Sequence, residues 1–489
     1  MRLRIGLLSL LSRLGKDENA TVLVQFSVYL IAIMGMIGLA TDGARFILLN
    51  SSLQDLADAA ALAGAADLDG TSGARTRATN DAQAMANQNP ARWYDVAGST
   101  TISVAFYSAI STTGDTAATG DQDANIIKVT TDSGWQVAPT FLRAVGAISN
   151  NSTQASAWAQ ATTGSCKPLQ LLLCNPQESA SGSTTGDPST EFTGLPGYMY
   201  HLKLKGGTGG YSPGDFNLLD PPGTNNPSAQ ALEQYLYQVN LGACSTDGSS
   251  PAPGQKTNPI ANGINVRFDQ PAGSSGDAST SAPIVIDGLS PTGGGGNNCN
   301  NPGSVTPPGF AQSDSGNAVA TYDTPCTSGS GSCPLPRDRS FVTTGSANIG
   351  TGATLADLQA YWTNHHPGTL PTGVTTRYQI YQLEVAGTGN AGTWKTDIVE
   401  PHGPMCSAVT GNASRRIISA AIIDCVYWGV KGSSVSNIPT NFYGDFFITE
   451  PSPGPGSGTN AGTIYTELIA THKANTPGSA LYRNVQLVR

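Results

Sequence analysis

The chain has 489 residues, of which 12% are charged, and a formal net charge of −9. Its 25 Lys and Arg residues are not concentrated in any stretch, which argues against a nucleic-acid-binding protein. The length predicts two or three domains, and 58 Gly with 31 Pro residues is typical of exported, loop-rich β domains.

The first predicted elements are a cytoplasmic basic tail over residues 1–19 and a transmembrane helix over residues 20–41. The segment Ala20–Ala40 has no formal charge and is as long as the roughly 20 residues that a helix needs to cross a bilayer. Basic side chains precede this segment, and acidic ones predominate after it. By the positive-inside rule we expect a single-pass protein of the inner (cytoplasmic) membrane, with its C-terminal bulk periplasmic or extracellular.

A cleaved signal peptide is the alternative interpretation, because Gly38-Leu39-Ala40 is a small-x-small triplet that signal peptidase accepts. The segment is longer than the roughly 7–15 residues of a signal-peptide core, and the helical pattern continues beyond the triplet. The sequence therefore favours an uncleaved signal anchor.

The helix is expected to continue past the membrane, because apolar residues recur there every three or four positions. This predicted partner-helix face consists of Phe46, Leu49, Leu53, Leu56, Ala60 and Ala63. It can dock on the chain's own sheet or on a helix of another subunit. We favour self-docking for Leu53 and Leu56, and partner contact nearer Phe46.

A small sheet is predicted after a second helix over Ala74–Asn87. Alternating or β-rich segments occur at Thr101–Tyr107, Ile126–Thr130 and Ser152–Ala161, and Pro139–Gly146 predicts a short helix. Residues 42–163 are therefore expected to form one domain, in which a long helix leads into a small sheet in a pilin-like layout.

A family resemblance rests on the residues that follow the membrane span. Thr41, Asp42, Gly43 and Arg45 form a small polar step, after which Leu53-Gln54 leads into the alanine-rich run 57–63. This segment resembles the N-terminus of TadE/TadG-like proteins of the Flp (Tad) pilus-assembly machinery. The resemblance implies a membrane-anchored protein whose partners are the inner membrane and other Flp/Tad pilus or secretion components.

Two features of related proteins are not reproduced. Gly15 lacks the glutamate five positions later that prepilin peptidase substrates carry, so pilin-type processing is not expected. Asp277, Ser279 and Ser281 spell the Asp-x-Ser-x-Ser pattern of a von Willebrand A metal site. A Gly- and Ser-rich stretch precedes them where that site needs a buried strand, so we interpret them as a loop.

Residues 164–489 are expected to form a large extracytoplasmic β-rich domain with a low-complexity loop near 271–335. Short apolar runs bounded by turns predict mainly antiparallel strands. The predicted strands are Met199–Leu204, Ile264–Phe268, Ala282–Asp287, Tyr378–Val385, Ile417–Val426 and Phe442–Thr449. Two helices are predicted, over Pro227–Asn240 and Leu355–Trp362.

All eight cysteines lie on the predicted exported side, and no CxxC motif occurs. An even number of dispersed cysteines in an exported chain predicts disulfides, whose pairing the sequence leaves open. The candidates are Cys166, Cys174, Cys244, Cys299, Cys326, Cys333, Cys406 and Cys425.

No residue pattern predicts catalysis, a cofactor, a metal or a small-molecule substrate. Gly387, Gly389 and Gly392 fit GxGxxG, but the following residues predict a strand, so a hairpin is expected in place of a nucleotide site. His365 and His366 are adjacent, without the spacing of zinc ligands on a helix. Asp121 and Asp123 are interpreted as polar turn residues because no further calcium ligands follow them.

The predicted fold class is α+β, with a transmembrane helix that continues into a pilin-like helix and small sheet. The predicted function is a structural, non-catalytic accessory (minor-pilin-like) component of Flp/Tad pilus assembly. The alternative is an envelope-anchored binding module or adhesin that acts through its C-terminal domain. An exported enzyme is the least favoured hypothesis.

Overall fold

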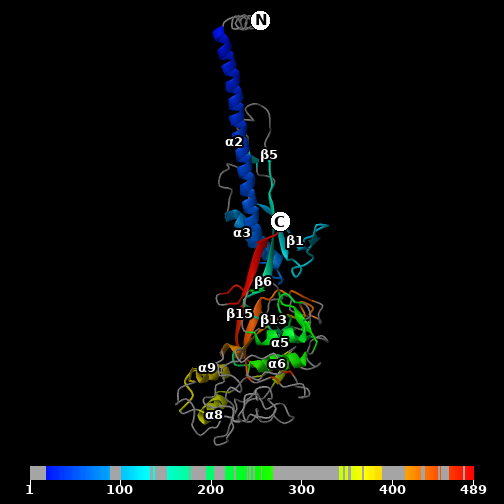
Figure 1. The fold of residues 1–489 in the computed structure, drawn as a ribbon, viewed down its shortest axis with the longest axis vertical. Helices are drawn as coiled ribbons and strands as arrows, with labels where there is room; N and C mark the ends of the chain where they lie inside the picture. Colours follow the sequence, from blue (N-terminus) through cyan, green and yellow to red (C-terminus); the bar gives the residue numbers. More distant parts are fainter. Residues whose placement is uncertain are drawn as a thin grey trace, which may run out of the picture. The chain divides into compact units, whose positions relative to one another are not determined.

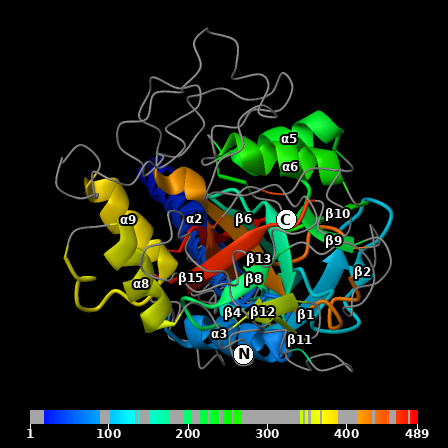
Figure 2. The same cartoon turned by 90° about the horizontal axis from the view of Figure 1, so that it is seen from below.

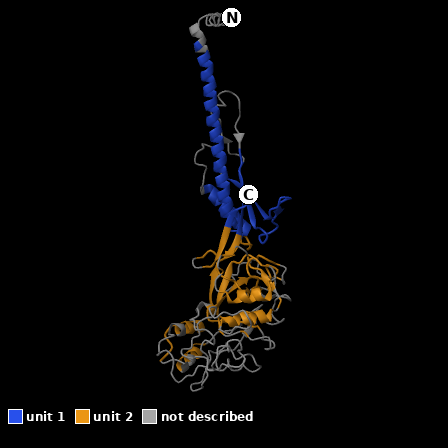
Figure 3. Ribbon diagram, in the orientation of Figure 1, with its two compact units in different colours: residues 1–68, 74–161, 485–489 blue, residues 69–73, 162–484 orange. Residues whose placement is uncertain are grey.

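The computed structural model describes most of the chain, in two compact units (Figure 3). The first unit contains Met1–Leu68, Ala74–Ala161 and Val485–Arg489, and the second contains Asp69–Gly73 and Thr162–Asn484. The described residues are 18–88, 101–132, 136–137, 151–175, 178, 194–202, 215–224, 227–238, 241, 244–245, 248–254, 256–267, 341–344, 347–350, 354–365, 368–387, 413–430, 435–449, 452, 462–476 and 479–489.

The first unit is built on one long helix, α2 (Glu18–Ala65), whose 48 residues include the predicted membrane span and its predicted continuation (Figure 1). A turn leads from it to α3 (Ala74–Gln88), which confirms the second predicted helix. The two helices approach closely at Gly64, where an added Cβ would lie 2.7 Å from the Ala78 carbonyl oxygen and 2.5 Å from Ile127 Cδ1. Only glycine fits this position without displacing the α3 backbone.

A five-stranded sheet completes the first unit, in the order β16-β6-β3-β1-β2. Its three main strands are antiparallel, with Val104 paired to Val129 and Ile127 paired to Ala159. The strands are β1 (Ile102–Ala109), β2 (Thr116–Ala117), β3 (Ile126–Thr131), β6 (Ser156–Ser165) and β16 (Leu481–Leu487), and a separate pair is formed by β4 (Gln136–Val137) and β5 (Asn151–Ser152). The predicted strands of this region are thus present, whereas the helix expected over residues 139–146 lies outside the described residues.

The second unit contains a nine-stranded sheet in the order β10-β9-β7-β13-β14-β15-β8-β12-β11. Its strands are β7 (Leu171–Cys174), β8 (Met199–His201), β9 (Asp215–Leu219), β10 (Pro251–Pro253), β11 (Phe341–Thr344), β12 (Ala347–Gly350), β13 (Ile417–Ile423), β14 (Phe442–Ile448) and β15 (Tyr465–Lys473). The pairing is antiparallel as expected, except between β7 and β13, which are parallel. A parallel pair needs a crossover connection, and more than two hundred residues separate these strands in the sequence.

The helices α5 (Ala229–Tyr237) and α6 (Thr257–Val266) lie side by side in the second unit (Figure 2). Their residues Leu232, Leu236, Ile260 and Ile264 join one hydrophobic core with the central strands. Two further helices, α8 (Leu355–His365) and α9 (Arg377–Gly387), form a small cluster of their own around Leu358, Trp362, Val374 and Ile380. The helices predicted at Pro227–Asn240 and Leu355–Trp362 are confirmed.

Two predicted strands are wrong. The run Ile264–Phe268 begins inside α6, and Tyr378–Val385 lies within α9. Both runs are too short for alternation to distinguish a strand from a helix, and packing decides the outcome. In α6 the buried Ile260 and Ile264 are four residues apart, on one face of a helix. The hairpin predicted around the GxGxxG glycines also loses its first strand, because Gly387 ends a helix and the other two glycines lie outside the described residues.

Candidate functional site

The N-terminal half of α2 carries the largest exposed apolar surface of the described residues. Consecutive side chains are exposed, so apolar residues cover every side of the helix and not a single stripe. Exposed large hydrophobic side chains of α2 are Val22, Phe26, Val28, Tyr29, Leu30, Ile31, Ile33, Met34, Met36, Ile37, Leu39, Phe46, Ile47 and Leu48. The helix is long and apolar enough to cross a membrane. Apolar exposure on all sides suits lipid better than a single groove of a partner protein.

The C-terminal half of α2 is buried in its own unit. Leu49 and Leu53 are fully buried and pack with Ile127 and Val129 of the small sheet. Among the other residues of the predicted partner-helix face, Leu56 and Ala60 are buried, Ala63 is half-buried and Phe46 is 37% exposed. The predicted face is therefore divided, with its N-terminal end exposed and the rest turned toward protein.

The residues that carry the family resemblance have definite positions in this packing. Ala57, Ala60 and Ala61 are fully buried in the same core as Ala78 and Ala82 of α3, and their small side chains let the two helices approach. Gln54 Nε2 donates hydrogen bonds to Asp58 Oδ1 at 2.7 Å and to the Ser156 carbonyl oxygen at 3.2 Å. The Leu-Gln step and the alanine-rich run thus attach α2 to α3 and to the start of β6.

A family comparison agrees with this segment. The family described as "Putative Flp pilus-assembly TadE/G-like" matches residues 21–67. This match covers the exposed apolar surface and the buried half of α2, and it confirms the resemblance predicted from the sequence for the N-terminal segment. Searches of the curated proteins and of the solved structures find no match.

The two aspartates considered as calcium ligands hold local structure together. Asp121 Oδ1 accepts hydrogen bonds from the backbone N–H of Arg75, at 3.2 Å, and from its Nε, at 3.0 Å. Asp123 accepts three hydrogen bonds from Thr119 and Gly120. Burial raises the pKa of Asp123, but these hydrogen bonds outweigh burial and hold it below its ordinary value. Among the described residues, no group of three or more His, Cys, Asp or Glu side chains is placed to bind a metal.

The described residues of the second unit contain two disulfides. Cys166 pairs with Cys244, and Cys174, the last residue of β7, pairs with Cys425, two residues beyond the end of the neighbouring parallel strand β13. The remaining candidates Cys299, Cys326, Cys333 and Cys406 lie outside the described residues, as do Asp277, Ser279, Ser281, His366 and His402.

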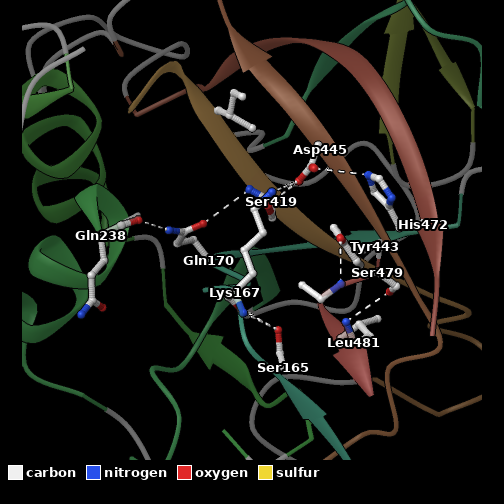
Figure 4. A network of polar contacts seen from close by, with 12 residues as sticks. Ser165, Lys167, Gln170, Gln238, Ser419, Tyr443, Asp445, His472, Ser479 and Leu481 are labelled. Atoms are coloured by element: carbon white, nitrogen blue, oxygen red, sulfur yellow. Dashed lines mark hydrogen bonds and ion pairs between the residues drawn. The ribbon is translucent and has the colours of Figure 1, made fainter. Parts of the chain in front are cut away.

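A polar network lies at the centre of the nine-stranded sheet (Figure 4). Asp445 on β14 is its common acceptor. Asp445 Oδ1 accepts hydrogen bonds from the Ser419 hydroxyl, at 2.6 Å, and from the Lys167 ammonium, while Oδ2 lies 3.3 Å from His472 Nε2. The sheet register explains the arrangement, since Ser419 pairs with Asp445 across β13 and β14, and His472 pairs with Tyr443 across β14 and β15.

This network does not have the geometry of a serine hydrolase. In such a triad the serine hydroxyl donates to histidine, whereas Ser419 donates to the carboxylate of Asp445. His472 instead stacks on the Tyr443 ring, with centroids 4.7 Å apart. The Tyr443 hydroxyl accepts from the backbone N–H of Ala480 at 3.2 Å. The contacts connect neighbouring strands and leave no poised nucleophile among these side chains.

Buried charges in the second unit were missed by sequence reasoning. Arg267 is fully buried and donates to the carbonyl oxygens of Leu236, Gln238, Arg415 and Ile417, and burial lowers its pKa to about 9. The carboxylate of Glu467 accepts from the backbone N–H groups of Arg377 and Tyr378, at the start of α9.

Burial raises the pKa of Glu467, while the Arg377 guanidinium, 3.4 Å away, opposes this rise. No local sequence signal could have identified either arginine, because these partners are 29 to 150 residues distant.

Proposed function

We propose that the chain is a membrane-anchored accessory component of Flp/Tad pilus assembly, minor-pilin-like, structural and non-catalytic. The observation that supports this most directly is the division of α2, whose exposed apolar half continues without interruption into the core of a small α+β unit. The same stretch matches the TadE/G-like family. The helix anchors the chain in the inner membrane, uncleaved, with the N-terminus in the cytoplasm and the C-terminal bulk periplasmic or extracellular.

The proposed topology places every cysteine in an oxidising compartment, where disulfides persist. The two disulfides of the second unit fit this placement. An alkaline phosphatase fusion after residue 70 is expected to be active in cells that express the chain. Soluble periplasmic protein that begins at Thr41 would show instead that the helix is cleaved.

The assembly role is tested by Leu53→Asp and Phe46→Asp in the native strain. Leu53→Asp places a carboxylate in a fully buried position, so the protein is expected to become protease-sensitive and scarce. Phe46 is partly exposed, so Phe46→Asp is expected to leave abundance intact while piliation falls. Normal piliation in both strains, with loss of surface attachment in a deletion strain, would favour the envelope adhesin.

A further inference from the structure

The exposed apolar surface of α2 extends past the predicted end of the membrane span. Phe46, Ile47 and Leu48 follow Ala40 by six to eight residues and are 37%, 68% and 59% exposed. From Val22 to Leu48 the helix rises by about 39 Å. This length exceeds the roughly 30 Å hydrocarbon core and is close to the roughly 40–45 Å of a whole bilayer with its headgroups.

At its C-terminal end, the exposed apolar surface of α2 stops within two residues. Leu48 is exposed and apolar, whereas Leu49 is fully buried in the protein core. The next exposed side chains, Asn50 and Ser51, are polar. A helix that passes from lipid directly into a folded unit shows such a boundary, because its apolar side chains are covered by lipid on one side and by protein on the other.

The polar residues before this boundary are compatible with a lipid environment. Thr41 is exposed, but its hydroxyl donates to the Ile37 carbonyl oxygen at 2.8 Å, so its hydrogen-bonding needs are met within the helix. Asp42 is only 3% exposed, so protein and not lipid surrounds it. Arg45 is exposed and has a side chain long enough to reach toward a lipid headgroup from the edge of the hydrocarbon.

We propose that the hydrocarbon core of the membrane surrounds the exposed side chains of α2 between residues 25 and 45, and that Phe46, Ile47 and Leu48 lie in the adjoining lipid headgroup layer. The span is thus displaced by about four residues from the 20–41 predicted by hydropathy, and the small α+β unit rests on the membrane surface without a linker. The displaced span begins at Gln25, the other polar interruption of the helix, and its twenty steps rise about 30 Å. This inference rests on the membrane anchor proposed above.

Cysteine accessibility in the full chain tests the position of the boundary. Three variants, Ile33→Cys, Ile47→Cys and Ser51→Cys, are placed in vesicles of phosphatidylethanolamine and phosphatidylglycerol and treated with a charged maleimide. Labelling is read by mass spectrometry on tryptic peptides 17–45 and 46–75, which contain no native cysteine. Ser51→Cys is the control for a thiol exposed to water, and Ile33→Cys is the control for a thiol inside the bilayer.

Ile47→Cys is expected to label at least about tenfold more slowly than Ser51→Cys, because lipid raises the pKa of a thiol and depletes the reactive thiolate. Detergent is expected to remove this difference. Equal labelling at positions 47 and 51 in vesicles would overturn the inference and leave the anchor intact. Protection of position 47 that persists in detergent would also overturn it, by showing that protein covers the surface. Labelling of position 33 without detergent would refute the anchor itself.

Discussion

The core of the first unit is built mainly from alanine, whereas the main core of the second unit contains leucine, isoleucine, phenylalanine and tyrosine. Alanine lets α2 and α3 approach closely but removes little apolar area from water for each residue. The first unit therefore depends on a few large side chains, notably Leu49, Leu53 and Ile127. The second unit has a larger core, two disulfides and buried charges.

The second unit has a partly exposed ion pair, Lys167 with Asp445, and also a fully buried one. In the first unit, Arg75 with Asp121 and Arg489 with Asp115 are partly exposed, so each contributes little. In the second unit, Arg377 and Glu467 are each 1% exposed. A buried pair specifies the docking of α9 on β15, but it leaves the unit vulnerable to the loss of either partner. The comparison teaches that close helix packing supports the first unit, whereas connections between distant segments support the second.

The largest expected effect is the loss of the buried carboxylate in the second unit. Glu467→Ala leaves the Arg377 guanidinium buried without its counter-charge and should lower the free energy of unfolding by about 3–5 kcal/mol. Glu467→Gln keeps an oxygen acceptor for the α9 backbone and should cost less. Urea-dependent proteolysis of the full chain, with fragments assigned by mass spectrometry, measures each unit separately. Asp115→Ala, which removes a partly exposed ion pair, is the control and should lower the free energy of unfolding by less than about 1 kcal/mol. An equally small decrease in Glu467→Ala would contradict this account.

The first unit should respond most strongly to truncation of its few large core residues. Leu53→Ala removes a fully buried side chain and should cost roughly 2–5 kcal/mol, since the neighbouring alanines fill little of the cavity. Leu48→Ala is the matched control, five residues away and 59% exposed, and should leave the unit's stability nearly unchanged. The same proteolysis measurement compares Leu53→Ala with Leu48→Ala. Equal losses of stability would show that the buried face of α2 does not stabilise the unit.

Reductant should lower the stability of the second unit alone, because the first unit contains no cysteine. Cys174→Ser with Cys425→Ser opens a link between residues 251 positions apart and should destabilise the second unit by roughly 2–4 kcal/mol. Dithiothreitol on the native chain should act in the same direction and leave the first unit unaffected. Unchanged protease resistance of the second unit after complete reduction, verified by thiol alkylation, would refute a stabilising role for these bridges.

The smallest effect tests how close the helices of the first unit lie. Gly64→Ala places a methyl group 2.7 Å from the Ala78 carbonyl oxygen and should cost roughly 1–3 kcal/mol through overpacking. Gly43→Ala on the same helix meets no atom within 4 Å and is the control. Hydrogen exchange in α2 and α3, measured at increasing temperature, should therefore show lower stability for Gly64→Ala than for Gly43→Ala. A Gly64→Ala protein as stable as Gly43→Ala would mean that the helices are farther apart.

Local periodicity was sufficient to predict the two helices and the strands β1, β3 and β6 of the first unit, but not β16, which joins the same sheet from residues 481–487. The apolar span, the three- and four-residue spacing after it and the alanine-rich run each describe one continuous helix, and α2 follows them. The alternation at Thr101–Tyr107 and the β-rich run Ile126–Thr130 likewise predict β1 and β3, whose apolar side chains pack on the core that α2 and α3 share. The type of each of these elements follows from its own short pattern, although β3 and β6 reach α2 from positions far along the chain.

In the second unit, tertiary structure alone decided the pairing of the segments and two of the helices. The helices α6 and α9 replace predicted strands because their apolar residues meet α5, α8 and the sheet, and no local pattern reveals those partners. The pairing of Cys174 with Cys425 and the convergence of Lys167, Ser419 and His472 on Asp445 depend on strand order. Composition identified cysteines and polar residues, but only the register of distant strands determined which of them meet.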